Sequence, residues 1–248
     1  MKTVGFDRGS LLVCLPFWDG DWEQARKVAL LLSDLLPEKQ KDCELMFVSR
    51  FDAKQADTTV VMHCMEKFAN VYSRKSRRRG VGFPMGCNEL AFDIFDHVSY
   101  SHSLFPQVRC ILIVESDCVM LTRTWSQELF TAWKFAELDG KSICGNLIPG
   151  NATGGPWHVN AVSMYSWDIV KKIPQLIGAP GTAGWDYYHG PHTTPYAVDT
   201  PLIYMDYKRS SISATELFKV RKKRQVPVLY HGVKDDSAIQ AVRKKFSI

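Results

Sequence analysis

Residues 109–117 read Arg109-Cys110-Ile111-Leu112-Ile113-Val114-Glu115-Ser116-Asp117, an apolar run that stops at two carboxylates. Four branched aliphatic residues in a row predict a strand that is buried on both faces, as in a parallel sheet covered by helices. Ligands of open α/β sheets bind at the carboxyl ends of such strands. The stretch therefore predicts both an α/β fold and a binding site at residues 115–117.

Glu115 and Asp117 are two positions apart, so on an extended chain their side chains point the same way. No Lys or Arg stands between them, and neighbouring carboxylates repel each other unless a positive group separates them. Hard divalent cations take carboxylate oxygens as ligands. The pair therefore indicates a metal site, and a solvated polar turn after the strand is the alternative.

The composition limits the class of protein. The chain has 248 residues, of which 46% are hydrophobic and 23% charged, and this fits a globular domain with an ample core. The sequence has no run of eighteen apolar residues and no signal-peptide pattern, so we expect no transmembrane segment. The seven cysteines are scattered, without a Cys-x-x-Cys pair, which favours a reducing, cytoplasmic compartment over a disulfide framework or a zinc site.

Basic residues are concentrated in three clusters, within a net charge of +5. Residues 74–79 and 219–224 each contain five basic residues in six, and Arg243, Lys244 and Lys245 follow near the end of the sequence. Such clusters suit an anionic partner, such as nucleic acid, a nucleoside diphosphate or an anionic lipid. Each cluster alone is equally consistent with a solvated face.

The chain opens with a strand, a helix and a strand. Residues 10–18 read as a buried strand, the apolar residues of 22–36 recur at helical spacing, and 43–48 read as a second strand. This order is typical of a doubly wound sheet with parallel neighbours. We predict further helices at 57–72, 89–98, 125–138, 166–177 and 236–246, and further strands at 142–148, 158–165 and 203–207.

Two irregular segments have the composition of binding loops. Residues 80–88 contain three glycines and a proline, so their backbone can approach a ligand closely, although they lack the pattern of a phosphate-binding P-loop. Residues 178–201 are rich in Gly, Pro, His, Tyr and Trp, and a loop this long in a compact domain is usually functional. A late apolar run then ends in His231, Gly232 and Lys234.

Together these features resemble the GT-A glycosyltransferases, metal-dependent enzymes that move a sugar from a nucleotide diphosphate to an acceptor. Residues 115–117 are similar to the Asp-x-Asp motif of that family, and residues 82–88 to the segment with Gly and Asn before it. Residues 231–234, His-Gly-Val-Lys, are similar to its late metal and phosphate motif. The resemblance covers residues 10 to about 235, nearly the whole chain.

The resemblance implies an α/β fold of the GT-A type, a Rossmann-like and mostly parallel sheet with helices on both faces. We expect a single domain over residues 1–248. Its nucleotide-binding half would span about 10–120 and its sugar and acceptor half about 121–235. A basic helix at 236–248 would follow.

The resemblance also implies Mn²⁺ or Mg²⁺ bound by Asp117 and His231, and a histidine ligand favours manganese. Glu115 stands where the family most often has Asp. Because its side chain is one methylene longer, we expect Glu115 to contact the ribose or a metal-bound water, with direct ligation as the alternative. Ser116 would lie against the donor, and Lys234 would lie near its phosphates.

The resemblance places the nucleotide, a UDP-sugar in our expectation, at the ends of the first two strands. Residues that would contact the donor there and in the glycine-rich segment are Pro16, Phe17, Trp18, Asp52, Arg79, Gly86 and Asn88. Ordinary core packing is the alternative for Phe17 and Trp18. His158 and Asn160 would line the pocket for the donor sugar.

Asp186 follows Trp185 in the long loop and is similar to the late acidic motif of the family. If the enzyme inverts the sugar, a carboxylate among aromatic side chains would have a raised pKa and could act as general base. If the enzyme retains the configuration, Asp186 would hold the acceptor. Asp199 is the second candidate for the base, and a loop hydrogen bond is the alternative for Asp186.

The acceptor is open at this stage. The basic clusters suit a bacteriophage-type enzyme for DNA modification, which would glycosylate hydroxylated pyrimidines in the host cytoplasm after flipping the base from the stack. A transferase for polysaccharide or glycolipid at an anionic membrane surface fits the same clusters. Two other classes are a sugar nucleotidyltransferase, whose Gly-rich motif residues 1–20 lack, and a non-catalytic nucleic-acid binder, which would need neither the acids nor His231.

Overall fold

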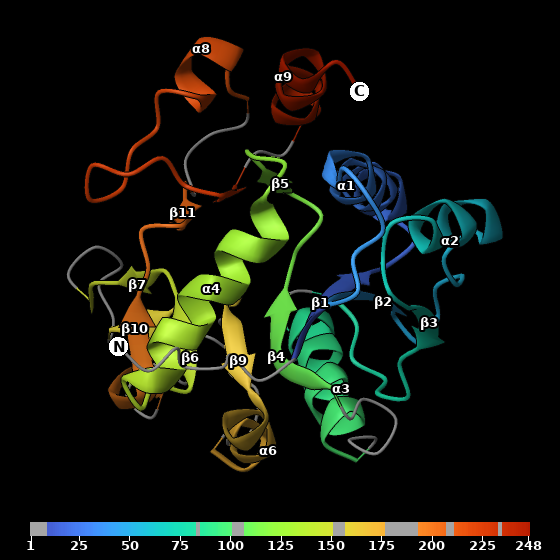
Figure 1. Ribbon diagram of the computed structural model, residues 1–248. Helices are drawn as coiled ribbons and strands as arrows, with labels where there is room; N and C mark the ends of the chain where they lie inside the picture. The colour runs from blue at the N-terminus through green and yellow to red at the C-terminus, as the bar shows by residue number, and fades with distance from the viewer. Residues whose placement is uncertain are drawn as a thin grey trace.

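A seven-stranded sheet in the order β10-β6-β9-β4-β1-β2-β3 forms the centre of the computed structural model, which describes residues 9–82, 85–100, 107–150, 157–176, 193–206, 211–232 and 235–248 (Figure 1). The strands are β1 (Ser10–Phe17), β2 (Cys43–Ser49), β3 (Val71–Lys75), β4 (Val108–Ile113), β6 (Ile143–Gly145), β9 (Met164–Ser166) and β10 (Ala197–Asp199). The first four are mutually parallel, β10 is parallel to β6, and β9 is antiparallel to both of its neighbours. The prediction of a mostly parallel α/β sheet is confirmed.

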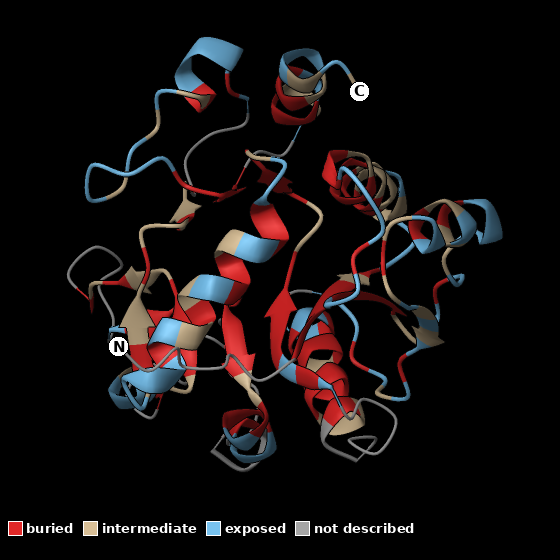
Figure 2. Ribbon diagram, in the orientation of Figure 1, coloured by how far each residue is buried: buried red, intermediate tan, exposed pale blue. Residues whose placement is uncertain are grey.

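Alternate residues of the central strands enter two separate cores, one on each face of the sheet. In β1, Leu11, Val13 and Leu15 face one core, whereas Leu12 and Cys14 face the other. Helices α1 (Trp22–Leu35), α2 (Thr58–Met65), α4 (Trp125–Leu138) and α9 (Ser237–Phe246) cover the first core, and α3 (Met85–Tyr100) and α6 (Trp167–Leu176) cover the second. The central strands are therefore buried on both faces (Figure 2), as their apolar runs predict.

A small second sheet connects the middle of the chain to its end. Its order is β11-β12-β5, where β5 is Cys118–Met120, β11 is Ile203–Met205 and β12 is Leu229–His231. The remaining elements are a ladder of β7 (Leu147–Ile148) with β8 (His158–Val159), the 3₁₀ turn η2 (Thr194–Tyr196) and α8 (Ala214–Leu217). Because β5 directly follows residue 117, this sheet decides what lies beside the Glu-Ser-Asp segment.

The prediction of one helix over residues 57–72 is wrong. Helix α2 ends at Met65, and residues 71–75 form β3 at the edge of the sheet. An edge strand pairs on one side only, so it tolerates charged residues that a central strand would not. The β-branched and aromatic pair Val71 and Tyr72, which favours a strand, was the signal for β3.

The predicted strand over residues 158–165 is also two strands, β8 and β9, separated by a turn. Asn160 makes this turn, because its side-chain Oδ1 accepts a hydrogen bond from the backbone N–H of Val162 at 3.0 Å. The predicted strand at 142–148 is likewise divided into β6 and β7. Strand β10 was not predicted, because it lies in residues 178–201, whose content of Gly, Pro, His, Tyr and Trp indicated a loop.

Candidate metal and nucleotide site

The Glu-Ser-Asp segment is a turn between β4 and β5. Strand β4 ends at Ile113, and the N–H of Cys118 donates to the carbonyl of Glu115 at 3.1 Å. The expectation that an extended strand aligns Glu115 with Asp117 is therefore wrong for the backbone. The two carboxylates nonetheless converge, because both face the same histidine.

His231 reaches the two acids through the pairing of β12 with β5. The register places His231 opposite Cys118, and the N–H of Gly232 donates to the carbonyl of Asp117 at 3.2 Å. The Nε2 atom of His231 lies 3.0 Å from Oδ1 of Asp117 and 3.0 Å from Oε2 of Glu115. Residues from distant parts of the sequence thus form one cluster at the carboxyl edge of the parallel strands.

Gly232 permits this close approach. Its φ of 122° is unfavourable for residues with a side chain, and a Cβ at this position would lie 2.1 Å from the carbonyl oxygen of Asp206. Asp206 follows the neighbouring strand β11, and its N–H donates to the carbonyl of His231 at 2.9 Å. The glycine after the histidine is therefore required by the backbone that holds the imidazole in place.

Two of the three side chains are shielded from water. The side chains of Asp117 and His231 are 5% and 6% exposed, whereas that of Glu115 is 42% exposed. Burial alone would lower the pKa of His231, but the hydrogen bonds with Asp117 and Glu115, and their negative charges, raise it to about 9. The cluster thus favours a positive charge at its centre, either a proton on the imidazole or a metal ion.

The arrangement fits a divalent cation. An octahedral ion with bonds of about 2.1 Å keeps neighbouring ligand atoms about 3.0 Å apart, which is the spacing from His231 Nε2 to each acid. The potential ligand atoms of Asp117, Cys118 and His231 all lie within 4.8 Å of one another. Carboxylates suit manganese or magnesium, the imidazole favours manganese of the two, and the thiol of Cys118 suits softer ions. Glu115 is as near to His231 as Asp117 is, but it does not belong to this group of potential ligand atoms, so both direct ligation and an outer contact stay predictions for it.

Asp21 adds a carboxylate to this edge of the sheet that was not among the predicted site residues. It lies just before α1, where its Oδ1 accepts from the backbone N–H of Trp18 at 2.7 Å and its Oδ2 accepts from the hydroxyl of Ser116 at 3.1 Å. Burial raises the pKa of Asp21, and the negative charge of Glu115 adds to the rise. Ser116 thereby attaches the acidic turn to the end of β1. The signal in the sequence was a second acid after the first strand, at the same edge of the sheet.

The aromatic residues after β1 have different environments. Phe17 is 2% exposed, and its ring centroid lies 4.6 Å from that of Trp22, so it packs in the core. Trp18 is 45% exposed, and the guanidinium of Arg50 lies over its ring, 5.1 Å from the centroid. Pro16 is partly buried within β1. Of these predicted contacts with the base, Trp18 is the one that presents an aromatic ring to solvent.

Asp52 is engaged by the same arginine. Its Oδ1 accepts from Nε of Arg50 at 2.6 Å and its Oδ2 from Nη2 at 2.9 Å. The hydrogen bonds with Arg50 lower the pKa of Asp52. The Asp52 carboxylate, which was predicted to contact the donor, therefore orients the arginine that lies over Trp18.

The glycine-rich segment leads into α3 at the same edge of the sheet. Arg79 is exposed, Gly86 and Asn88 are buried in the first turns of the helix, and the N–H of Gly86 donates to the carbonyl of Gly82 at 2.6 Å. The predicted donor contacts of these three residues stay predictions, and their positions at the carboxyl edge are compatible with them.

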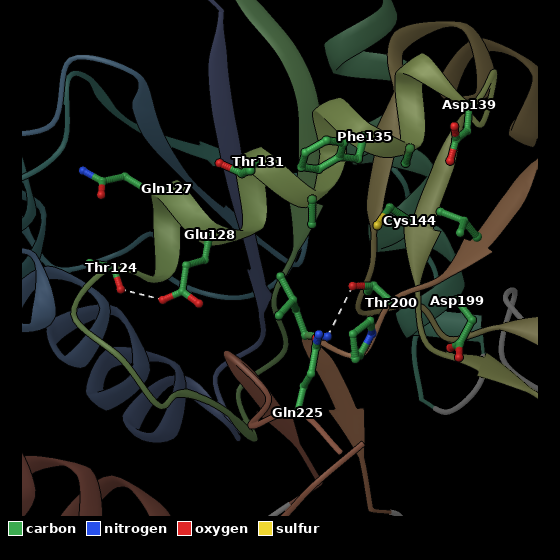
Figure 3. A pocket seen from close by; sticks show the side chains of 15 residues that line it. Thr124, Gln127, Glu128, Thr131, Phe135, Asp139, Cys144, Asp199, Thr200 and Gln225 are labelled. Atoms are coloured by element: carbon green, nitrogen blue, oxygen red, sulfur yellow. Dashed lines mark hydrogen bonds between the residues drawn. The ribbon is translucent and has the colours of Figure 1, made fainter. Parts of the chain in front are cut away.

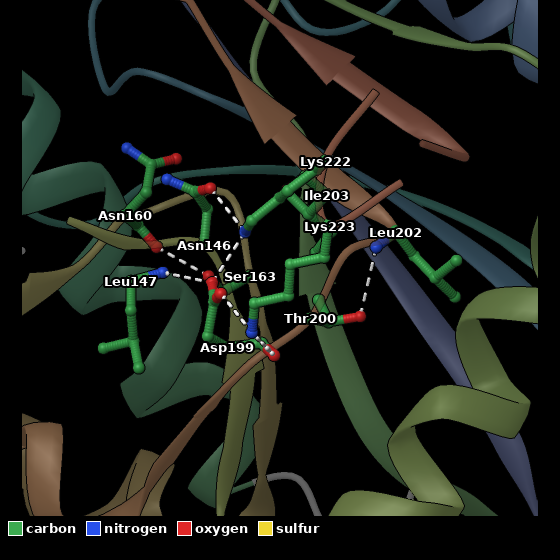
Figure 4. Close-up of polar contacts among 10 residues, drawn as sticks. All are labelled: Asn146, Leu147, Asn160, Ser163, Asp199, Thr200, Leu202, Ile203, Lys222 and Lys223. Carbon is green, nitrogen blue, oxygen red and sulfur yellow. Dashed lines mark hydrogen bonds and ion pairs between the residues drawn. The ribbon is translucent and has the colours of Figure 1, made fainter. Parts of the chain in front are cut away.

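Of the two predicted bases, Asp186 lies outside the described residues, as does Lys234. Asp199 forms ion pairs with two lysines, through Oδ1 with Lys222 at 2.6 Å and through Oδ2 with Lys223 at 2.7 Å (Figure 4). Burial raises the pKa of Asp199, but the hydrogen bonds from the lysines lower it below its ordinary value. Asp199 is therefore poorly suited to remove a proton.

A pocket of about 760 Å³ lies between α4 and the connection from β10 to β11 (Figure 3). It is largely apolar, with Phe135, Cys144 and Leu202 in its wall, and Asp199 lies at one side. The described residues that line this pocket do not include Glu115, Asp117 or His231. The pocket is thus separate from the cluster of acids and histidine.

The arrangement of strands is that of a GT-A type glycosyltransferase fold. Mouse xyloside xylosyltransferase 1, in its apo form, superposes with a TM-score of 0.54 and 13% identity, over 90% of this chain and 97% of that one. The apo structure of the bifunctional glycosyltransferase WbbM superposes with a TM-score of 0.58 and 10% identity, over 98% of this chain and 50% of that one, so this chain spans half of WbbM. No protein-family model matches the sequence, and no curated protein matches it significantly. Identities this low show the fold alone.

Across the described ranges, the helices are too short or too polar to cross a lipid bilayer.

Proposed function

We propose that this protein is a glycosyltransferase that moves a sugar from a nucleoside-diphosphate donor to a hydroxyl group, with a divalent cation bound by Asp117, His231 and Glu115. The observation that supports the proposal best is the meeting of Asp117 and Glu115 at His231, each 3.0 Å from its Nε2 atom, at the carboxyl edge of a GT-A type sheet. Ligands of α/β sheets bind at this edge. The glycosyltransferases with the same fold support the general reaction.

The proposed chemistry explains why buried acids and a histidine are useful here. A nucleoside diphosphate gains negative charge as the sugar departs, and a bound divalent cation would stabilise that charge as a Lewis acid. Asp117 and His231 exclude water from the inner side of the site, whereas the more exposed Glu115 closes its outer side. Lys234 is proposed to lie near the phosphates.

For the donor, we propose that the base stacks on Trp18, with UDP as the first candidate. The exposed ring of Trp18 and the guanidinium of Arg50 offer a flat, positively charged surface, which Asp52 holds in place. The hydrogen bond between Ser116 and Asp21 keeps the acidic turn against this surface. The base and the diphosphate would then lie along one edge of the sheet.

A thermal-shift experiment with UDP, in the presence and absence of Mn²⁺, tests the donor half of the proposal. A ligand that binds only the native state raises its stability by mass action, so UDP should raise the Tm more with Mn²⁺ than without. Asp117→Asn and His231→Gln should abolish the manganese-dependent part. Asp139→Asn, on an exposed carboxylate at the end of α4, serves as the matched control.

Transfer or hydrolysis should then be measured on a panel of UDP- and GDP-sugars with Mn²⁺. Full activity of Asp117→Asn and His231→Gln would show that the metal assignment is wrong. If UDP raises the Tm equally with and without Mn²⁺, the proposal of nucleotide binding is supported and the proposal of a metal ion is rejected.

For the acceptor, we propose a polyanion, with DNA that carries hydroxylated pyrimidines as the candidate. Arg74 and Arg78 of the first basic cluster are paired with carboxylates of α3, but Lys75, Arg77 and Arg79 are exposed beyond the end of β3. Exposed cations at the edge that holds the proposed donor site would attract phosphates, and the binding would weaken steeply with salt.

Gel-shift measurements on duplex DNA at rising salt test the acceptor, with Lys75, Arg77 and Arg79 replaced by Gln in a triple variant. The wild type should bind at low salt and the variant should bind more weakly. If the wild type does not bind DNA at low salt but binds vesicles with anionic lipids, the acceptor is sought among glycolipids and polysaccharides at a membrane surface instead.

A further inference from the structure

A side-chain amide lies behind His231, on the side away from the acids. The Oδ1 atom of Asn160 is 3.2 Å from Nδ1 of His231. The same Oδ1 accepts the backbone N–H of Val162 at 3.0 Å. A backbone N–H can only donate, so the amide atom between Val162 and His231 must be the oxygen and not the nitrogen.

This orientation determines where the imidazole carries its proton. An amide oxygen can only accept, so Nδ1 of His231 must be the donor in their contact. A neutral imidazole has one N–H, and Nε2 is then the nitrogen with the lone pair. Nε2 is also the atom that lies 3.0 Å from Asp117 and Glu115.

The turn that carries the Asn160 amide is held by hydrogen bonds that do not involve His231. The backbone N–H of Asn160 donates to the carbonyl of Asn146 at 3.0 Å, and its carbonyl accepts from the hydroxyl of Ser163 at 2.7 Å. Asn146 in turn accepts from the half-buried amine of Lys222 at 2.6 Å, within the network around Asp199 (Figure 4). These contacts come from β6–β7 and the 222–225 turn, so the position of Asn160 does not depend on a bound ion.

We propose that Asn160 is a positioning residue that fixes the tautomer and the ring plane of His231, so that Nε2 is presented to the divalent cation. The inference rests on the proposed function, because it presupposes a metal at this site. Partners that hold the second nitrogen of a metal-binding histidine orient the ring and raise its affinity for the ion. Asn160 acts through His231.

The first test is a titration with Mn²⁺ alone, in which electron paramagnetic resonance measures the free ion at one fixed pH. Asn160→Ala should weaken Mn²⁺ binding by about 10- to 100-fold. Asn160→Asp keeps an oxygen that accepts from both N–H groups, so it should bind within about threefold of wild type. Ser163→Ala loosens the same turn but leaves the contact with Nδ1, so its loss should be far smaller than that of Asn160→Ala.

The outcomes separate the inference from the proposed function. If the wild type binds no Mn²⁺, the proposed metal site is wrong. If the wild type binds Mn²⁺ and Asn160→Ala binds it equally well, or if Ser163→Ala loses as much as Asn160→Ala, the positioning role is wrong and the metal site stands.

A second measurement does not depend on any variant folding. Long-range proton–nitrogen NMR of the Mg²⁺-loaded wild type should show His231 with its proton on Nδ1. A proton on Nε2 would overturn the inference whatever the variants do.

Discussion

Raising the pH should destabilise the metal-free protein through His231. In the absence of a metal ion, the charge that separates Asp117 from Glu115 is the proton on this imidazole. The pKa of His231 is raised from 6.5 to about 9, because its hydrogen bonds with the two acids outweigh the effect of burial. A group whose pKa is higher in the folded state stabilises that state below its unfolded pKa, and this stability is lost as the pH rises through the folded pKa.

The magnitude follows from the shift. Each pKa unit corresponds to about 1.4 kcal/mol, so the full contribution is about 3 kcal/mol below pH 6.5. About 2 kcal/mol remains at pH 7.5, and nearly none at about pH 10. The side chain of His231 is 6% exposed, so solvent screening reduces these values little.

Urea unfolding of the protein in a metal chelator, from pH 6.5 to 10, measures this effect. Other groups titrate in the same range, so the quantity of interest is the difference between wild type and His231→Gln at each pH. That difference should shrink by about 2 kcal/mol between pH 7.5 and 10. With saturating Mn²⁺ the trend should reverse, because the ion displaces the proton and binds more tightly as the pH rises.

A pH profile of stability that is the same in wild type and His231→Gln would refute the reasoning. It would mean that the imidazole is not held between two carboxylates in the metal-free protein. If the stability difference between wild type and His231→Gln shrinks with pH in chelator as expected, but does not reverse its trend with Mn²⁺, the cluster of side chains is supported and the metal ion is rejected.

Three further predictions concern residues around the cluster. Gly232→Ala should lower the free energy of unfolding by at least about 2 kcal/mol in urea, because its Cβ would collide with the carbonyl of Asp206. Trp18→Ala should weaken UDP binding about tenfold in calorimetry without lowering the Tm, because its exposed ring supplies stacking and little core; an unchanged affinity would move the base elsewhere. Lys222→Met should cost about 2 kcal/mol in urea, because the half-buried Asp199 loses one of its two charged hydrogen-bond partners, whereas a neutral result would mean that Lys223 alone compensates the carboxylate.

The elements with a strong period were predictable. The bounds of β1, β2, β4, α1 and α4 were predicted to within one or two residues. A strand buried on both faces has a continuous apolar run, and a helix buried along one stripe has apolar residues at helical spacing, so the sequence shows both directly. Strand β10 was not predicted, since its three residues lie in a segment whose composition is typical of a loop. The edge strand β3 was predicted as part of a helix because its side chains lack the pattern of a strand. It is a strand because its backbone pairs with β2.

For the site, the sequence indicated the chemical groups, and the tertiary structure decided their geometry. Glu115, Asp117 and His231 were identified from their places at the ends of apolar runs. The distances of 3.0 Å from His231 to each acid depend on the register of β12 with β5, which no local pattern specifies. The contact of Asn160 with Nδ1 of His231 depends on a turn between two strands that were predicted as one.

The sequence by itself thus determined the parallel α/β layering and the acidic segment after the apolar run of β4, because both follow from side chains that are close in the chain. Only the tertiary structure decided that the acids lie in a turn, that Asp21 and Ser116 support that turn, and that Asp199 is neutralised by lysines. Those relations join residues far apart in the sequence, and such contacts form only when the whole sheet is assembled.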